Sequence, residues 1–159
     1  MTKEFKIRIA EKKDTVIILK FIKELAVYEK LLHEVKAYEE MLQFNLFEKK
    51  YAEVVIGELG GEPVGFALFF HNFSTFLGKP GIYLEDLFVK DEFRGRGFGK
   101  QLLAYLAKLA VERDCGRLEW SVLDWNKPAI DFYLSLGAET MDEWITFRLT
   151  GEKLEALGS

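Results

Sequence analysis

The segment from Gly81 to Ala110 constrains the fold most, because it reads as a strand, a glycine-rich corner and a helix in direct succession. Residues Ile82–Val89 are apolar on both strand faces apart from Glu85 and Asp86, which predicts a central strand covered above and below. Side chains alternate along a strand, so these two acids are expected to point to opposite faces. Leucines then recur at helical spacing, so a helix is expected to begin in the glycines.

The corner between this strand and helix, residues 94–99, reads RGRGFG and has the chemistry of an anion site. Glycines let backbone approach a ligand closely, and the free N–H groups of a helix's first turn bind anions with the help of the helix dipole. Nearby Arg94, Arg96 and Lys100 add positive charge, so a phosphate or pyrophosphate is the expected ligand. The glycine spacing fits neither the dinucleotide fingerprint G-x-G-x-x-G nor a Walker A loop.

Composition limits the class of protein. With 159 residues, 49% of them hydrophobic, the chain is expected to form one domain over residues 1–159. A soluble cytoplasmic protein is expected, because no apolar run reaches membrane-spanning length and the amino terminus lacks the apolar segment of a secretory signal. The net charge of −4 argues against nucleic acid and agrees with a cationic substrate. The single cysteine, Cys115, and the two histidines indicate no disulfide and no metal site.

The remaining segments predict an α/β domain. Besides the central strand, strands are expected at residues 5–10, 51–59, 64–73, 117–123 and 138–149, and helices at 14–31, 37–47, 127–136 and 152–157. Asn126 is expected to cap the helix that Gly137 ends. This order predicts a mixed sheet with helices on both faces.

Two motifs resemble those of the GNAT family of N-acetyltransferases. The first family motif, Gln or Arg, two residues, Gly, one residue, then Gly or Ala, is matched by Arg94, Gly97 and Gly99. The second is matched at Asn126, Ala129, Phe132, Tyr133, Gly137 and Ala138. The resemblance is closest to the spermidine/spermine branch, through residues 23–30, 83–89, 94–99 and 124–138. It implies a GNAT-like mixed, mostly antiparallel twisted sheet of six to seven strands.

The resemblance implies that acetyl-coenzyme A (acetyl-CoA) is the acetyl donor, with coenzyme A (CoA) as the product, and that an amine attacks it directly in a ternary complex. The cofactor-binding residues it implies are Leu87, Phe88, Val89, Arg94, Gly95, Arg96, Gly97, Phe98, Gly99, Lys100, Asn126, Lys127, Pro128 and Ala129. The substrate-binding residues it implies are Tyr28, Glu29, Glu85, Glu119, Trp120 and Ser121, and an acidic contact of the branch falls near Asp142 and Glu143.

The chemistry needs a base and an acid. An alkylamine with a pKa of about 10.4 is almost wholly protonated at neutral pH, so some group must take its proton before attack. Glu85 is the candidate base and would act directly or through a water. The alternative interpretation is that Glu85 has a structural role, as an acid at a strand end that accepts hydrogen bonds from backbone donors. The family places a backbone donor for the oxyanion at Leu87 and a tyrosine as general acid at Tyr133. The alternative interpretation of Tyr133 is an aromatic side chain of the hydrophobic core without a catalytic role.

These inferences leave three functions open. The first is acetylation of a polyamine or diamine, and the second is acetylation of an amino-acid side-chain amine such as a thialysine-like compound. The third is a CoA-binding module without catalysis. A homodimer is expected by resemblance, with neither nucleic acid nor membrane as a partner.

Overall fold

A mixed sheet of five strands, in the order β1-β2-β3-β4-β5, forms the framework of the first of two units. This computed structural model describes residues 3–159, so Met1 and Thr2 of the amino-terminal segment lie outside it. Strands β1 to β4 pair antiparallel in chain order, and β5 pairs parallel with β4. The strand bounds are β1 Phe5–Ile9, β2 Glu53–Leu59, β3 Glu62–Ser74, β4 Lys79–Val89 and β5 Leu118–Trp120.

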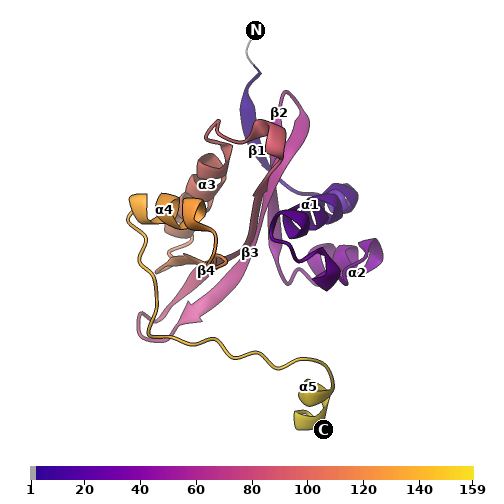
Figure 1. Ribbon diagram of the computed structural model, residues 1–159, viewed down its shortest axis with the longest axis vertical. Helices are drawn as coiled ribbons and strands as arrows, with labels where there is room; N and C mark the ends of the chain where they lie inside the picture. The colour runs from indigo at the N-terminus through magenta and orange to yellow at the C-terminus, as the bar shows by residue number, and fades with distance from the viewer. Residues whose placement is uncertain (1–2) are drawn as a thin grey trace. The chain divides into compact units, whose positions relative to one another are not determined.

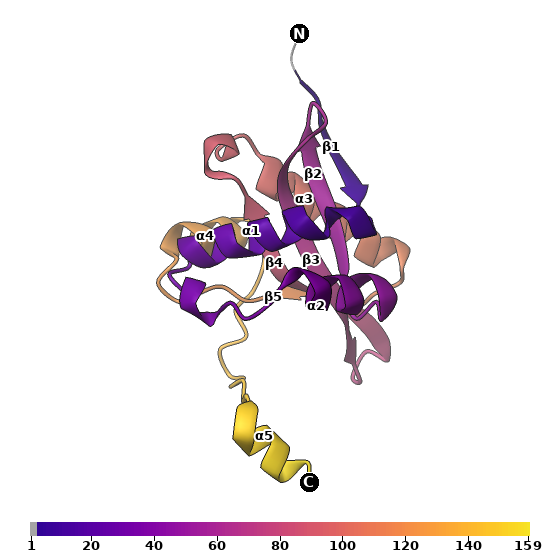
Figure 2. The ribbon, with the colours of Figure 1, turned by 90° about the vertical axis from the view of Figure 1, so that its right-hand side faces the viewer.

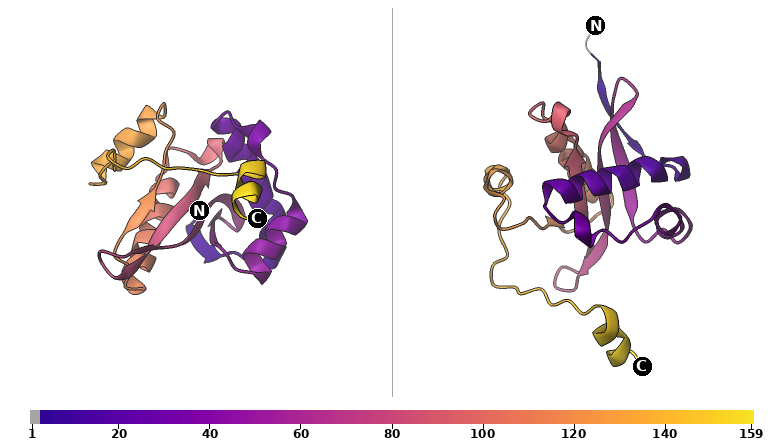
Figure 3. Two further views of the ribbon diagram at one scale, coloured as in Figure 1. Left: turned by 90° about the horizontal axis from the view of Figure 1, so that it is seen from below. Right: turned by 45° about the vertical axis from the view of Figure 1, so that its right-hand side comes forward.

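Helices cover both faces of this sheet. Helices α1 (Thr15–Tyr28) and α2 (Glu39–Gln43) lie on one face, and α3 (Phe98–Glu112) lies on the other (Figures 1 and 3). In Figure 2, α1 and α2 lie in front of the strands. The helix expected at residues 37–47 is α2 followed by a π-helical turn, Phe44–Glu48. No helix within residues 3–159 is long and apolar enough to cross a membrane.

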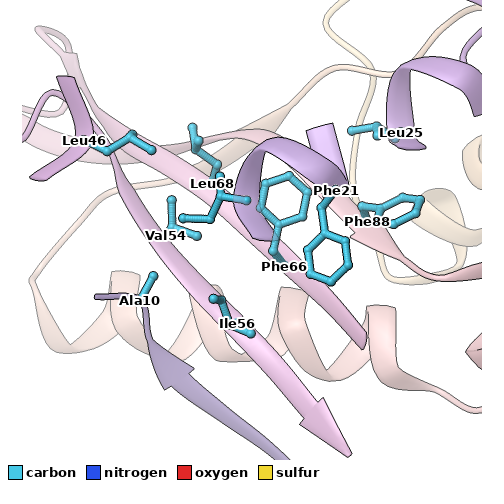
Figure 4. Close-up of a cluster of buried hydrophobic side chains, with 10 residues drawn as sticks. Ala10, Phe21, Leu25, Leu46, Val54, Ile56, Phe66, Leu68 and Phe88 are labelled. Atoms are coloured by element: carbon cyan, nitrogen blue, oxygen red, sulfur yellow. The ribbon is translucent and has the colours of Figure 1, made fainter. Parts of the chain in front are cut away.

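Aromatic packing joins α1 to the middle of the sheet. Phe21 of α1 is fully buried, and its ring lies 5.7 Å from those of both Phe66 on β3 and Phe88 on β4 (Figure 4). Burying such a side chain stabilises a fold by about 1.5–3 kcal/mol. This contact shows that Phe66 and Phe88 face α1.

On the opposite face, α3 is fixed by leucines and by an aromatic stack. Leu102 and Leu106 have no exposed surface, and the Phe98 ring stacks on that of Phe5 with 4.2 Å between centroids. Gly57 permits the stack, because a Cβ there would lie 2.6 Å from the Phe5 ring. The start of α3, and with it the glycine corner, is therefore held against the sheet.

The second unit, Val122–Ser159, contains α4 (Lys127–Ser135) and α5 (Gly151–Leu157). The helix predicted at residues 127–136, with its Asn126 cap and Gly137 stop, is confirmed, and so is the short terminal helix. The strand predicted at residues 138–149 is wrong, because this segment has no regular structure. The prediction of one domain over residues 1–159 stays a prediction.

The sheet therefore has five strands within the described residues, where six to seven were expected. The alternation of apolar residues around Trp144, Ile145 and Phe147 is compatible with a strand, but all three side chains are exposed here. A strand also needs a hydrogen-bonding partner, which a pattern along one segment cannot supply.

Candidate functional site

The glycine corner has the backbone geometry of an anion site. Gly95 and Gly97 have φ angles of +78° and +82°, a region that favours glycine, and Gly97 is the residue that precedes α3. The first helical hydrogen bond runs from Gln101 N to Gly97 O at 3.0 Å. The N–H groups of the turn before it, residues 98–100, therefore point out of the helix end. A Cβ at either glycine would meet nothing within 4 Å, so the space beside the corner is open.

Arg94 anchors this corner to the rest of the unit. Its Nε donates to the Val89 carbonyl at 3.0 Å, its Nη1 lies 2.8 Å from an Asp91 carboxylate oxygen, and its guanidinium lies 4.6 Å from the Tyr28 ring centroid. These partners show that Arg94 positions the loop between β4 and α3. The other two cationic residues near the corner are placed differently from Arg94. Arg96 packs over the Phe98 ring, and Lys100 is exposed.

The end of β4 has a free edge. Pairing with β5 stops at Leu84, which lies opposite Trp120, whereas β4 continues to Val89. On its other side, the Lys90 amide donates to Val64 O of β3 at 2.8 Å. Because successive amides point to opposite edges of a strand, the amides of Leu87 and Val89 face the edge that β5 leaves open. An extended ligand can pair with β4 there.

A β-bulge changes how the two acids of β4 are placed. In the β3–β4 register, Leu84 lies opposite Phe69 and Asp86 opposite Leu68, so Glu85 is an extra residue. Leu68 and Phe69 are neighbours on β3 and face opposite sides, so Leu84 and Asp86 do too, although they are two residues apart. The bulge interrupts the simple alternation from which Glu85 and Asp86 are expected to lie on opposite faces, so the orientation expected for Glu85 stays a prediction.

Three carboxylates lie close to one another where the bulge of β4 meets the end of α1. Asp86 shares a face with Phe88, which contacts Phe21 of α1, and Glu29 is the residue that follows α1. The pKa of Asp86 is raised to about 6, mainly by burial and in addition by the negative charges of Glu85 and Glu29. Burial also raises the pKa of Glu29. A cluster of this kind attracts a cation, and a carboxylate with a pKa of about 6 can accept a proton near neutrality.

Asp86 was not among the candidate catalytic residues predicted from the sequence. The pair of adjacent acids at residues 85 and 86 was the available signal in the sequence. The bulge that places Asp86 opposite Leu68, on the α1 face, cannot be recognised from the sequence of β4 alone. Of the predicted substrate residues, Tyr28, Glu29 and Glu85 lie around this cluster or on the Arg94 anchor.

The predicted substrate residues on and after β5 already have protein partners. Glu119 Oε1 accepts hydrogen bonds from Asn72 Nδ2 and Arg117 Nε, both at 2.9 Å. The Ser121 hydroxyl lies 2.6 Å from the Tyr83 hydroxyl. Trp120 is half-buried at the end of β5. These contacts fix the wall of the sheet beside the acid cluster.

The remaining predicted residues belong to the second unit. Asn126 Oδ1 accepts from the Ala129 amide at 3.4 Å, and Pro128 lies in the first turn of α4, as expected for a helix start. Lys127 forms an ion pair with Asp131 at 2.9 Å. Tyr133 lies on α4 next to Phe132, with 5.7 Å between ring centroids. The roles of these residues stay predictions.

A cavity of about 400 Å³ lies elsewhere in the first unit. Its wall is mostly apolar and includes none of the predicted site residues: it is formed by Ile9, Ala10, Leu46, Phe47, Lys50, Ala52, Glu53, Val54, Val55, Phe69, Tyr105, Leu109 and Arg113. The anion corner and the acid cluster therefore define the candidate site, and this cavity does not.

Comparison with known proteins agrees with this geometry. Residues 19–138 match the model of the acetyltransferase (GNAT) family. A thialysine N-epsilon-acetyltransferase of Bos taurus is 40% identical over 163 residues, which cover 95% of each chain. An L-ornithine N5-acetyltransferase of Arabidopsis thaliana is 34% identical over 198 residues, covering 96% of this chain and 87% of that one.

Two further similarities are more distant. A spermidine/spermine N(1)-acetyltransferase-like protein of Homo sapiens is 30% identical over 161 residues, covering 94% of this chain and 23% of that longer one. Among solved structures, an integron cassette protein from the mobile metagenome of V. cholerae has a TM-score of 0.81 and 28% identity, with 97% of each chain covered.

The corner predicts a specific response to Gly97→Val. A side chain at residue 97 would enter the open space beside the free amides, so CoA affinity should fall by about tenfold or more. Isothermal titration calorimetry measures this. Gly78→Val is the matched control, because Gly78 also has a positive φ, +67°, and open space around its Cβ but lies in the β3–β4 turn. Equal loss of CoA affinity in both variants would contradict the assignment of the glycine corner as the binding site for the CoA pyrophosphate.

The raised pKa of Asp86 predicts that Asp86→Asn increases the stability of the fold at neutral pH and decreases activity. A carboxyl whose pKa is higher in the folded state makes the fold less stable as pH rises from about 4 to 6. The variant should lose this pH dependence and be more stable at pH 7.5 by up to about 3 kcal/mol, while its kcat/KM falls about tenfold or more. Urea unfolding at several pH values measures stability. An unchanged pH dependence would contradict the assignment.

Proposed function

This chain belongs to the acetyltransferase (GNAT) family and is an acetyl-CoA-dependent N-acetyltransferase, and from that premise we propose that it acetylates the side-chain amine of a small basic amino acid. Ornithine and thialysine are the compounds named in its relatives. The observation that carries the proposal is the gathering of Glu29, Glu85 and Asp86 beside the open edge of β4. This arrangement can hold an ammonium group next to an extended ligand.

The acid cluster would both bind and deprotonate the amine. A protonated amine is drawn to carboxylates in a half-buried site, where their field is screened less than in water. Asp86, with a pKa of about 6, is mostly ionised at neutral pH and is the better matched of the acids to take the proton. Glu85 would then stabilise the bound ammonium or relay the proton through a water. This assigns the base role to Asp86 in addition to the predicted Glu85.

The corner and the free edge would hold acetyl-CoA, which supplies the activated acetyl thioester when bound. The amides of residues 98–100 and the open space at Gly95 and Gly97 suit its pyrophosphate. The Leu87 amide, which faces the open edge, would donate a hydrogen bond to the acetyl oxygen as negative charge develops on it. The Val89 carbonyl is already bonded to Arg94, so Leu87 and the Val89 amide are the groups left for pairing.

Tyr133 would act as the general acid, donating its hydroxyl proton to the departing thiolate. Residues 126–129, at the start of α4, would contribute further contacts to acetyl-CoA. Both roles rest on the family motif in the second unit.

A polyamine is the second candidate substrate. The charge of the acid cluster suits any oligocation, and one relative is a spermidine/spermine N(1)-acetyltransferase-like protein. A homodimer in the cytoplasm is the assembly and location that we infer for either substrate.

A panel of amines tests the proposal. Purified full-length protein is given acetyl-CoA with ornithine, thialysine, lysine, putrescine or spermidine, and thiol release is followed at several amine concentrations. We expect kcat/KM for ornithine or thialysine to exceed that for spermidine by about tenfold or more. A preference for spermidine would overturn the amino-acid proposal in favour of the polyamine.

Tyr133→Phe separates chemistry from binding. Loss of the hydroxyl should lower kcat on the order of 10²-fold while CoA affinity stays within about twofold, because the ring is retained. Steady-state kinetics and calorimetry measure the two effects, with Phe132→Tyr as a neighbouring control. An undiminished kcat would remove Tyr133 from the acid role.

A further inference from the structure

The cavity of about 400 Å³ outside the candidate site lies where the sheet loses its edge strand. Strand β1 ends at Ile9, which pairs with Val55 of β2, and the Ala10 amide just after β1 donates to Val54 O at 2.9 Å. Glu53, the first residue of β2, lies beyond the last paired residue of β1. Ala10 and Val54, which line the cavity, are labelled in Figure 4. The cavity therefore occupies the space that the short edge strand leaves.

Helix α3 and the turn after α2 close this space with mostly apolar side chains. Tyr105, Leu109 and Arg113 follow one another at intervals of four residues and so lie on one stripe of α3 and its end. Leu46 and Phe47, from the π-helical turn after α2, line the cavity too. Pockets that bind small molecules have volumes of about 300–1,000 Å³ and mostly apolar walls with a few polar groups. The cavity has the size and the wall of such a pocket.

The backbone of the segment between α2 and β2 has two unusual conformations beside the cavity. The Lys49 amide donates to Phe44 O at 2.9 Å, which is the pattern of a π-helical turn, and the Tyr51 amide donates to Asn45 O at 3.0 Å. Lys50 has a φ of +56°, in the left-handed region that residues other than glycine adopt rarely. Both conformations cost energy and are found often at functional sites. They place Lys50, which is exposed, in the wall of the cavity and hence at its mouth.

The two other charged residues of the wall are paired with each other. Arg113 Nη1 and Nη2 donate to the two Glu53 carboxylate oxygens at 2.7 and 2.9 Å, which lowers the pKa of Glu53. Arg113 Nη1 also lies 2.9 Å from His71 Nε2. His71 Nδ1 lies 3.0 Å from Gly81 O, so Nδ1 carries the proton and Nε2 accepts from Arg113. Because a cation already holds both of its oxygens, Glu53 is not free to bind an ammonium group.

Lys50 leaves the wall with one positive charge in excess. Among residues 3–159, no hydrogen bond or ion pair involves the Lys50 ammonium, whereas Arg113 and Glu53 offset each other. An apolar cavity with a cation at its mouth matches a molecule that has an aliphatic chain and an anionic head group. The chain leaves water on binding, and the head group keeps a counter-charge. A terminal ammonium group would instead lie next to a like charge.

We propose that this cavity binds a small aliphatic monocarboxylate, with its chain against Leu46, Phe47 and Leu109 and its carboxylate at Lys50. The site is separate from the glycine corner and from the acid cluster, so the inference does not depend on which amine is acetylated. Hydrophobic stabilisation is proportional to the apolar area buried, so each methylene that enters the cavity should tighten binding about fourfold. The carboxylate should contribute less, because Lys50 is exposed and ion pairs in contact with solvent are weak.

Calorimetric titration of the full-length protein with butanoate and hexanoate tests the chain, and hexan-1-ol and hexylammonium test the head group. From butanoate to hexanoate we expect Kd to fall on the order of tenfold, with hexanoate binding more tightly than hexan-1-ol and hexylammonium binding least. Each titration is made with and without saturating CoA, and hexanoate should bind equally in both. An affinity that does not change with chain length, or that is lost when CoA is bound, would overturn the inference.

Variants locate the site. Lys50→Gln should weaken hexanoate binding about threefold to fivefold and leave hexan-1-ol binding unchanged. Lys49→Gln is the matched control, because Lys49 is exposed and adjacent but does not line the cavity. Ala52→Leu places a larger side chain in the wall and should weaken both ligands, with thermal unfolding to show that the variant is folded. In NMR spectra, hexanoate should shift the amides of residues 46–55 and 105–113. Equal hexanoate affinity in Lys50→Gln and Lys49→Gln, or shifts confined to other residues, would overturn the site.

Discussion

The way β4 pairs with its two neighbours determines the candidate site. Toward β3 the register slips at Glu85, which brings Asp86 onto the face that α1 covers and places it near Glu29. Toward β5 the pairing stops at Leu84, which leaves the amides of Leu87 and Val89 without a strand partner among the described residues. One strand therefore supplies acids for an amine on one face and backbone donors at its edge. An unpaired edge in a central strand is costly unless a ligand or side chain completes it.

Arg94 connects this strand to the anion corner. It bonds to the last carbonyl of β4, pairs with Asp91 in the following turn and packs on Tyr28 at the end of α1. The corner is also held from the other direction, where Phe98 stacks on Phe5. These contacts fix the free amides of residues 98–100 relative to the open edge before any ligand arrives. Such preorganisation lowers the entropic cost of binding an extended molecule.

Much of this arrangement could be predicted from local pattern. The glycine corner, the helix after it and the Asn126 cap were read correctly because each depends on a few neighbouring residues. The bulge at Glu85 and the early end of β5 could not be read, because both depend on the register between strands that are distant in sequence. Asp86 was overlooked for that reason. The absent strand at residues 138–149 shows the same limit, since alternation gives a segment a strand-like pattern but no partner.

Amide hydrogen exchange with and without CoA tests most directly whether the open edge and the corner hold this ligand. The amides of Leu87 and Val89 and those of residues 98–100 should exchange more slowly when CoA is bound. The amide of Lys90, already bonded to Val64 O at 2.8 Å, serves as an internal reference and should change little. Unchanged exchange at Leu87, Val89 and residues 98–100 under saturating CoA would contradict the site.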